Sequence, residues 1–152
     1  MTKISDTRRA MLTQSVALAA VGALAGAGNA TAATSAKEGT YRVAFQVSDS
    51  DPKKWTLTLN NVNNVQKDLG AANVTIEIVA FGPGIDMLKA ESEVGTRVQE
   101  ALAAGVGVFA CQNTMHGQHL KPEDMVDKIG YVPAGVVELI KRQTEGWAYI
   151  RS

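Results

Sequence analysis

Short apolar runs alternate with segments of helical periodicity between residues 41 and 150, and this alternation restricts the fold more than any other feature. The strand-like runs are residues 41–47, 74–81, 106–111, 131–132 and 147–150. The segments between them are mostly a dozen or more residues long, which suits crossovers between parallel strands rather than hairpins. The sequence therefore predicts an α/β fold, with a parallel sheet covered by helices on both faces.

The connecting segments carry start and stop signals of helices. Asp51-Pro52 is typical of a helix cap followed by proline in the first turn, and Gly70 ends that helix. A second helix is expected between Ser92 and Gly105, and a third over residues 135–144. Residues 113–128 predict only short helical pieces.

The apolar residues at the end of the chain are expected to belong to the core. Val136, Leu139 and Ile140 have the spacing of an inward-facing helical stripe. Trp147 and Tyr149 share one face of the last strand. An oligomer contact is the alternative for these two aromatic residues.

The first 32 residues have the features of an export signal. Arg8-Arg9, followed by Met11-Leu12, resembles a twin-arginine signal, and a run rich in alanine and glycine extends to about Ala27. That run is too short and too weakly apolar for a membrane span. A Sec signal that carries two arginines is the alternative.

Small residues before the folded region offer cleavage after Ala30 or Ala32. We expect residues 1–32 to be the signal, 33–39 a flexible tail and 40–152 the domain. The expected location is the periplasm, without membrane attachment after cleavage. Of the 15 basic and 15 acidic residues, three basic and one acidic lie in the signal, so the rest is slightly acidic. It has no basic stripe for nucleic acid.

Cys111 is the only cysteine, and it ends the apolar run at residues 106–111. An exported protein with one cysteine has no internal disulfide, which is the usual use of cysteine in an oxidising compartment. Three interpretations remain: an inert core thiol, an intermolecular bridge or a reactive thiol. The end of a buried strand suits the third, because ligands of open α/β sheets bind at the carboxyl edge.

The same edge is expected to gather other groups. Asp49 follows the first strand, and Gly82-Pro83-Gly84 follows the second. These four residues are candidates for a ligand pocket, since glycine lets the backbone approach an anion closely. A tight turn is the simpler interpretation of Gly82-Pro83-Gly84. The sequence has no dinucleotide fingerprint, Ser–His–Asp pattern or Cys-x-x-Cys motif, and no cofactor is expected.

Both histidines follow Cys111 within eight residues. His116 is a candidate for polarising the thiol, together with Asn113. Cys111, His116 and His119 form a Cys-x4-His-x2-His pattern that would suit zinc or copper. One short stretch rarely holds three ligands, so we predict no metal site. Two solvent-facing histidines on a polar loop are the remaining alternative.

Several segments together resemble the DsrE/DsrF family of sulfur-relay proteins, which includes TusD-like and YchN-like members. The resemblance covers residues 40–151, and its segments are Val43–Val47, Leu59–Val62, Ile78–Gly84, Val108–Asn113 and Val132–Leu139. It implies a single three-layer α/β/α domain with a mainly parallel five-stranded sheet. It also implies a homo-oligomer, a trimer or a hexamer.

The resemblance further implies a role for Cys111. In the sulfur-transferring members, a cysteine at the end of this strand carries sulfur as a persulfide, and Cys111 occupies the matching position. The implied function is an exported sulfur carrier or sulfurtransferase with a sulfur donor or acceptor protein as partner. A non-catalytic module that binds a small ligand or a protein is the main alternative, and a metal-binding protein is a further one.

Overall fold

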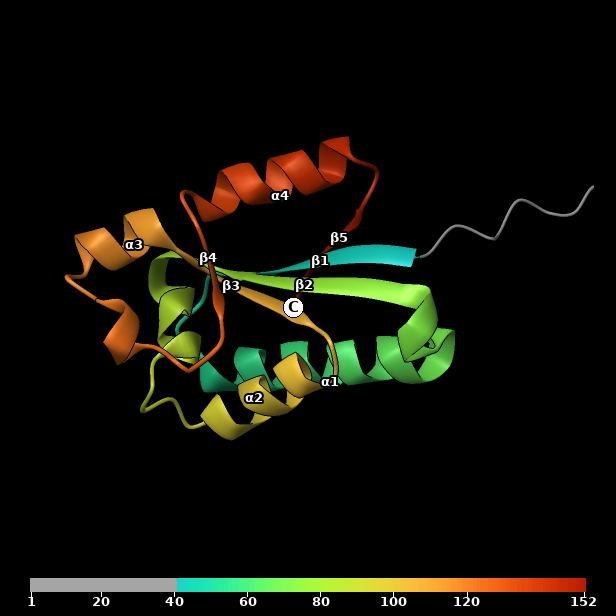
Figure 1. The fold of residues 1–152 in the computed structure, drawn as a ribbon, viewed down its shortest axis with the longest axis horizontal. Coiled ribbons are helices and arrows are strands. Elements are labelled where there is room, and N and C mark those ends of the chain that lie inside the picture. The colour runs from blue at the N-terminus through green and yellow to red at the C-terminus, as the bar shows by residue number, and fades with distance from the viewer. Residues whose placement is uncertain (1–40) are drawn as a thin grey trace, which may run out of the picture. The chain divides into compact units, whose positions relative to one another are not determined.

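The computed structural model describes residues 41–152. The predicted signal and tail lie outside the described residues, so these two predictions stay predictions. Five strands and four α-helices follow one another in the described part (Figure 1). They are β1 (Tyr41–Val47), α1 (Pro52–Leu69), β2 (Val74–Ala80), α2 (Gly95–Ala103), β3 (Gly107–Cys111), α3 (Gln112–Gly117), β4 (Gly130–Val132), α4 (Gly135–Thr144) and β5 (Ala148–Arg151). The described part also contains three 3₁₀ helices: η1 (Ala71–Asn73), η2 (Gly82–Leu88) and η3 (Pro122–Asp124).

The strands form one sheet in the order β4-β3-β2-β1-β5, and every neighbouring pair is parallel. Helices α1 and α2 cover one face, and α4 covers the other (Figure 1). The predicted α/β fold with a five-stranded parallel sheet is therefore confirmed. The register pairs Val47 with Ala80 and Cys111 with Val132, so these strand ends meet at one edge.

The two sheet faces bury separate sets of apolar side chains. The larger set lies beneath α1 and α2 and includes Trp55, Leu59 and Val62, which form an apolar stripe along α1. Asp51 caps this helix as predicted, because its carboxylate accepts a hydrogen bond from the Lys53 amide at 2.9 Å. The smaller set lies beneath α4 and consists of Ala44, Val79, Val132 and Leu139. No helix within residues 41–152 has both the length and the apolar character needed to span a bilayer.

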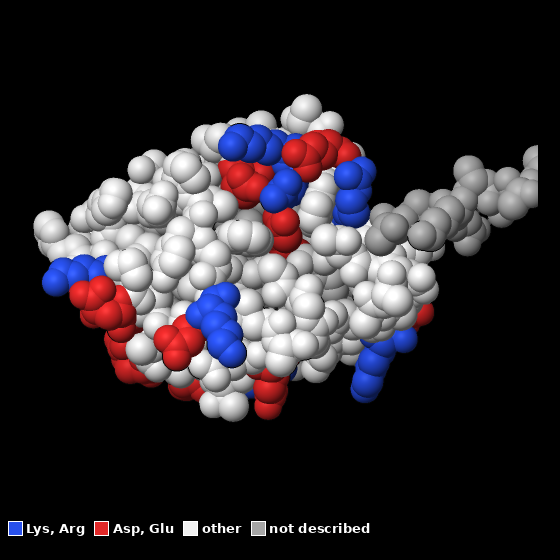
Figure 2. Space-filling view, viewed as in Figure 1, with Lys and Arg blue, Asp and Glu red and all other residues white. Residues whose placement is uncertain are grey.

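The predicted orientation of α4 is wrong for two of three residues. Leu139 is buried, whereas Val136 and Ile140 are 55% and 56% exposed. Glu138 faces inward, because its carboxylate pairs with Arg142 one turn later at 2.9 Å. Figure 2 shows acidic and basic side chains gathered over this helix. The ion pair between Glu138 and Arg142 thus occupies part of the inward face of α4 that was predicted to be apolar.

The predicted burial of Tyr149 is also wrong. Its side chain is 40% exposed, and its hydroxyl donates to Gln46 Oε1 at 2.6 Å. Trp147 is partly buried and packs against the smaller apolar set. Its ring also lies 5.0 Å from the guanidinium of Arg142.

Candidate functional site

Cys111 ends β3 at the edge of the sheet where β3 and its neighbour β4 lead into different helices. It is the cap residue of α3, and the neighbouring strand β4 leads instead into α4. The Asn113 amide donates to the Pro133 carbonyl at 3.1 Å and joins the two departing segments. Alternation along β3 directs Phe109 and Cys111 toward α4 and Val108 and Ala110 toward α1 and α2. The thiol therefore lies near the first turn of α4.

The surroundings of Cys111 favour its charged form although the residue is only 5% exposed. Burial raises the pKa of the thiol. Hydrogen bonds from the Thr114 hydroxyl and from the backbone of Gly135, Thr114 and Asn113 outweigh burial, and the pKa of Cys111 is lowered. The Cys111 side chain makes no capping hydrogen bond to α3. A thiolate is the nucleophilic form of cysteine.

Gly135 brings the start of α4 close to this thiol. It is buried, and a Cβ atom at this position would lie 2.8 Å from Cδ1 of Phe81. Any larger residue would have to displace Phe81 or move the first turn of α4. The lack of a side chain at Gly135 thus lets the first turn of α4 pack closely against Phe81.

The turn after β2 reaches the same edge of the sheet. Gly82-Pro83-Gly84 opens η2, and the predicted place of these residues in a ligand pocket stays a prediction. A Cβ atom on Gly84 would lie 2.3 Å from the Val47 carbonyl oxygen, which makes glycine obligatory there. The Gly82 amide donates to Thr114 Oγ1 at 3.0 Å and connects this turn with the surroundings of Cys111.

Asp49 follows β1 and is held by two cations. Its carboxylate lies 3.1 Å from Lys54 Nζ and 3.3 Å from Arg151 Nη2. Hydrogen bonds to Lys54 and Arg151 lower the pKa of Asp49, so it stays ionised at neutral pH. These contacts tie α1 and β5 to the end of β1. Asp49 acts here as a structural anion, and its predicted place in a ligand pocket stays a prediction.

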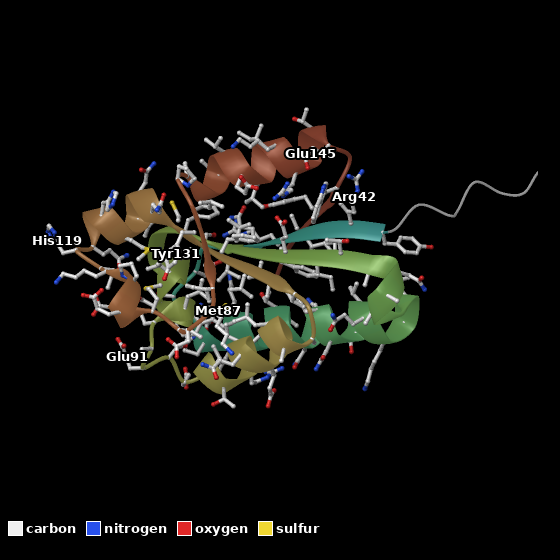
Figure 3. All side chains as sticks on the ribbon, in the orientation of Figure 1. Arg42, Met87, Glu91, His119, Tyr131 and Glu145 are labelled. Atoms are coloured by element: carbon white, nitrogen blue, oxygen red, sulfur yellow. The ribbon has the colours of Figure 1, made fainter. Side chains whose placement is uncertain are left out.

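The two histidines lie in different surroundings. His116 lines a small pocket of about 120 Å³ beside the site, together with Gln112, Met115, Leu120, Pro122 and Tyr131. His119 has left-handed backbone, with φ +57°, and lies at the outer end of α3 (Figure 3). Residues 41–152 bring together no group of three or more histidine, cysteine or acidic side chains suited to a metal ion. The metal-binding alternative thus gains no support from the geometry.

A larger cavity of about 540 Å³ lies along α2 and the segment that follows η3. Its lining includes Gln99, Leu102 and Lys128 but none of the predicted site residues. Cavity volume alone would place the candidate site there. The chemistry of a polarised thiol places the candidate site at the end of β3 instead.

Two residues of the site were missed by sequence reasoning. Thr114 looks like an ordinary polar residue of a short helix, and Gly135 looks like the start of one. Their contacts with Cys111 arise because β2, β3 and β4 end at the same edge. Only the spacing of Thr114 three residues after Cys111 offered a signal, since the third residue of a helix often reaches back toward its cap.

Comparison with known proteins places the fold among characterised structures. The model of the DsrE/DsrF-like family matches residues 42–151. A solved structure of a protein of unknown function, MTH1491 from Methanobacterium thermoautotrophicum, is 38% identical, with a TM-score of 0.71. The match covers 74% of this chain and 99% of that chain. No curated protein matches the sequence.

Two more distant structures share the fold. The ychN protein of E. coli is 10% identical with a TM-score of 0.58, over 75% of this chain and 99% of that chain. BT1422 of Bacteroides thetaiotaomicron, also a protein of unknown function, is 15% identical with a TM-score of 0.56. That match covers 73% of this chain and 94% of the other.

Proposed function

The chain belongs to the DsrE/DsrF-like family, which is related to sulfur-relay proteins, and from this premise we propose that it is an exported sulfur carrier. Cys111 accepts sulfane sulfur as a persulfide and passes it to the thiol of a partner. The observation that carries the proposal is the position of Cys111, which ends β3 at the carboxyl edge of the sheet and caps α3. The lowered pKa of this thiol supports it, because burial alone would raise that pKa. The donors from α3 and α4 that cause this lie at the carboxyl edge of the sheet, where α/β proteins bind ligands.

The chemistry is a pair of thiol exchange steps that need no external oxidant. With thiosulfate as donor, the Cys111 thiolate attacks the outer sulfur. A bond forms between the two sulfurs, and sulfite leaves with the electron pair of the broken S–S bond. In the second step a partner thiolate attacks the outer sulfur of the persulfide, and Cys111 leaves as thiolate. A lowered pKa raises the thiolate fraction for the first step and improves the leaving group in the second.

The proposal includes a location and an assembly. Residues 1–32 direct export to the periplasm, where the carrier meets its sulfur donor and acceptor. The chain works as a homo-oligomer, a trimer or a hexamer. Exposed apolar side chains on α4, Val136, Val137 and Ile140, support contact with another copy, because clustered exposed apolar residues commonly mark protein interfaces.

Mass spectrometry of the intact protein tests the proposal. After incubation with thiosulfate or polysulfide, the wild type is expected to gain the mass of added sulfur, and a reductant should remove it. Cys111→Ser is the matched control and should gain none. The proposal fails if folded wild type gains no sulfur although iodoacetamide alkylates its thiol.

The low exposure of Cys111 favours a second candidate, a non-catalytic module that binds a ligand or protein at this edge. In that case Cys111 is a packed side chain, and Cys111→Ser leaves binding intact. Persulfide formation at Cys111 in the folded protein would exclude an inert thiol.

A further inference from the structure

The cavity of about 540 Å³ beside α2, here called the α2 cavity, has two walls of different character. One wall comes from α2 and consists of Gln99, Leu102 and Ala103, and the other consists of Asp127 and Lys128. The volume is in the range of natural sites for small molecules. The α2 cavity thus presents a neutral, partly apolar wall together with a wall that carries one charge of each sign.

The neutral wall results from the way α2 is oriented. Its two charged residues, Arg97 and Glu100, lie on a different side, where they line a small cavity against α1. The Arg97 guanidinium donates to Asn60 Oδ1 of α1 at 2.8 Å. Val98 is completely buried between the helix and the sheet. The side of α2 that lines the α2 cavity therefore contributes no charge, and only the opposite wall can attract the charged groups of a ligand.

The charged wall is unpaired, and its backbone is anchored on both sides. In the part of the chain that the structure describes, neither Asp127 nor Lys128 forms an ion pair. They lie between Val126 and Ile129, which are both buried. The Val126 amide also donates to the Leu88 carbonyl at 2.8 Å. The two charges are therefore held at the cavity and remain available to a ligand.

Lys128 has a backbone conformation that lysine rarely adopts. Its φ is +65°, in the left-handed region that normally selects glycine or asparagine. His119 is the other described residue of this kind, but histidine adopts the conformation more readily. Residues in sparsely populated conformations are concentrated at binding sites, where the surrounding structure holds them. Since glycine would form this turn more easily, the lysine side chain indicates a use at the α2 cavity.

We propose that the α2 cavity binds a free α-amino acid with an apolar side chain. Asp127 binds the ammonium group and Lys128 the carboxylate, while the side chain of the ligand lies along Leu102 and Ala103. The two charges come from consecutive residues, whose Cα atoms are about 3.8 Å apart. The two charged groups of an α-amino acid are similarly close, because both are bonded to one carbon, whereas the ends of a peptide are further apart. This site does not include Cys111 and is additional to the proposed sulfur transfer.

Titration of the full chain with L-leucine, followed by NMR of the backbone amides, tests the inference. Saturable shifts are expected at Gln99, at Leu102 and in the turn at residues 127–128. Two analogues keep the apolar group but lack one charge: 4-methylpentanoate has no ammonium group, and 3-methylbutylamine has no carboxylate. Each should bind about fivefold more weakly, because each loses one ion pair at an exposed site. An analogue that binds as tightly as leucine overturns the ligand class, and a lack of saturable shifts at these residues overturns the site.

Two variants test the charged wall directly. Asp127→Asn and Lys128→Asn each remove one charge and should weaken leucine binding about fivefold. Because asparagine tolerates a left-handed φ, the thermal unfolding midpoint of Lys128→Asn should stay the same or rise. A fall in leucine affinity without a fall in that midpoint would show that the lysine serves binding rather than folding.

Glu100→Gln is the matched control for Asp127→Asn. It also removes one negative charge, but from the side of α2 that faces α1, so leucine should bind as it does to the wild type. Wild-type affinity in Asp127→Asn contradicts the inference, and so does an equal loss in Glu100→Gln. The comparison of leucine with its two analogues uses the wild type and decides the question even if a variant does not fold.

Discussion

Arg142 of α4 donates through Nε to the carboxylate of Glu77 in β2 at 2.7 Å, and this contact ties the last helix to the middle of the sheet. The same guanidinium pairs with Glu138 at 2.9 Å and with Glu145 at 3.1 Å. Hydrogen bonds to Glu77 and Glu145 raise the pKa of Arg142 against the effect of burial. Figure 3 shows Glu145 next to Arg42, whose guanidinium donates to the Glu145 carbonyl at 2.7 Å.

Replacing Arg142 by methionine should strongly destabilise the protein. Glu77 would lose its ion pair at a nearly buried position, and Glu138 would keep only its longer contact with Lys141 at 3.9 Å. Since Arg142 is partly exposed, the expected loss is about 2–3 kcal/mol of unfolding free energy, below the range for fully buried pairs. Urea unfolding of Arg142→Met, Glu77→Gln and the double variant measures this. The double variant should lose less than the sum of the single losses, and strict additivity would contradict the coupling.

Gly82 and Gly84 should respond differently to alanine. At Gly84 the added methyl group meets the Val47 backbone, which has no free side chain to move aside. We expect Gly84→Ala to cost more than about 3 kcal/mol or to prevent folding. At Gly82 a Cβ atom meets nothing within 4 Å, and the only cost is the left-handed φ of +54°. That strain should cost about 1–2 kcal/mol, which thermal unfolding can check. Equal losses for both variants would contradict the close approach at Gly84.

Replacing Arg8 and Arg9 by two lysines should block export if the twin-arginine interpretation is right. A Sec signal needs only positive charge at this end and would tolerate the change. Fractionation of cells that express the full chain measures the periplasmic share. Unchanged export of the lysine variant would favour the Sec alternative. A wild-type chain that stays entirely in the cytoplasm would contradict both.

Polar residues at two exposed positions of α4 should weaken self-association. Val136→Ser with Ile140→Ser removes apolar surface without emptying the core, since both residues are more than half exposed. Sedimentation should show a smaller species, and the unfolding free energy at low concentration should change little. Leu57→Ser on α1 is the matched control, because Leu57 is 46% exposed and belongs to a helix on the opposite sheet face. An unchanged assembly in the double variant would place the contact elsewhere.

The lowered pKa of Cys111 should make stability depend on pH in a known direction. The folded protein releases the thiol proton at lower pH than the unfolded chain does. The resulting stabilisation is complete above the unfolded thiol pKa, about 8.5, and is lost as the pH falls through the folded pKa. The wild type should therefore gain stability relative to Cys111→Ser as the pH rises from neutral toward that value. Urea unfolding at several pH values under reducing conditions measures the difference. A flat or opposite trend would show that the donors do not stabilise the thiolate.

The sequence was sufficient for the strands, the main helices and the place of Cys111 at a strand end. These depend on periodicity and on local signals such as Asp51-Pro52, which act within a few residues. The orientation of α4 was not predictable in this way. Glu138 turns inward only because Arg142 and Glu77, which are far apart in sequence, meet there.

The surroundings of Cys111 were also not predictable from the sequence. The Gly82 amide donates to the Thr114 hydroxyl across 32 positions of sequence, and Gly135 approaches the same strand end from another helix. The spacing of Thr114 after Cys111 is the one local signal, and the approach of Gly135 leaves no pattern in the neighbouring residues. Asn113 was predicted to help polarise the thiol, and its backbone is one of the groups that lower the pKa of Cys111.

Strand β4 has only three residues and forms the edge of the sheet beside Cys111. An edge strand this short is held by few backbone hydrogen bonds and opens more readily than the central strands. The nearly buried Cys111 therefore lies beside the shortest strand of the sheet. A large partner would reach the Cys111 thiol faster when β4 opens more often. The rate of that reaction and the rate of amide exchange at Tyr131 and Val132 should therefore rise and fall together.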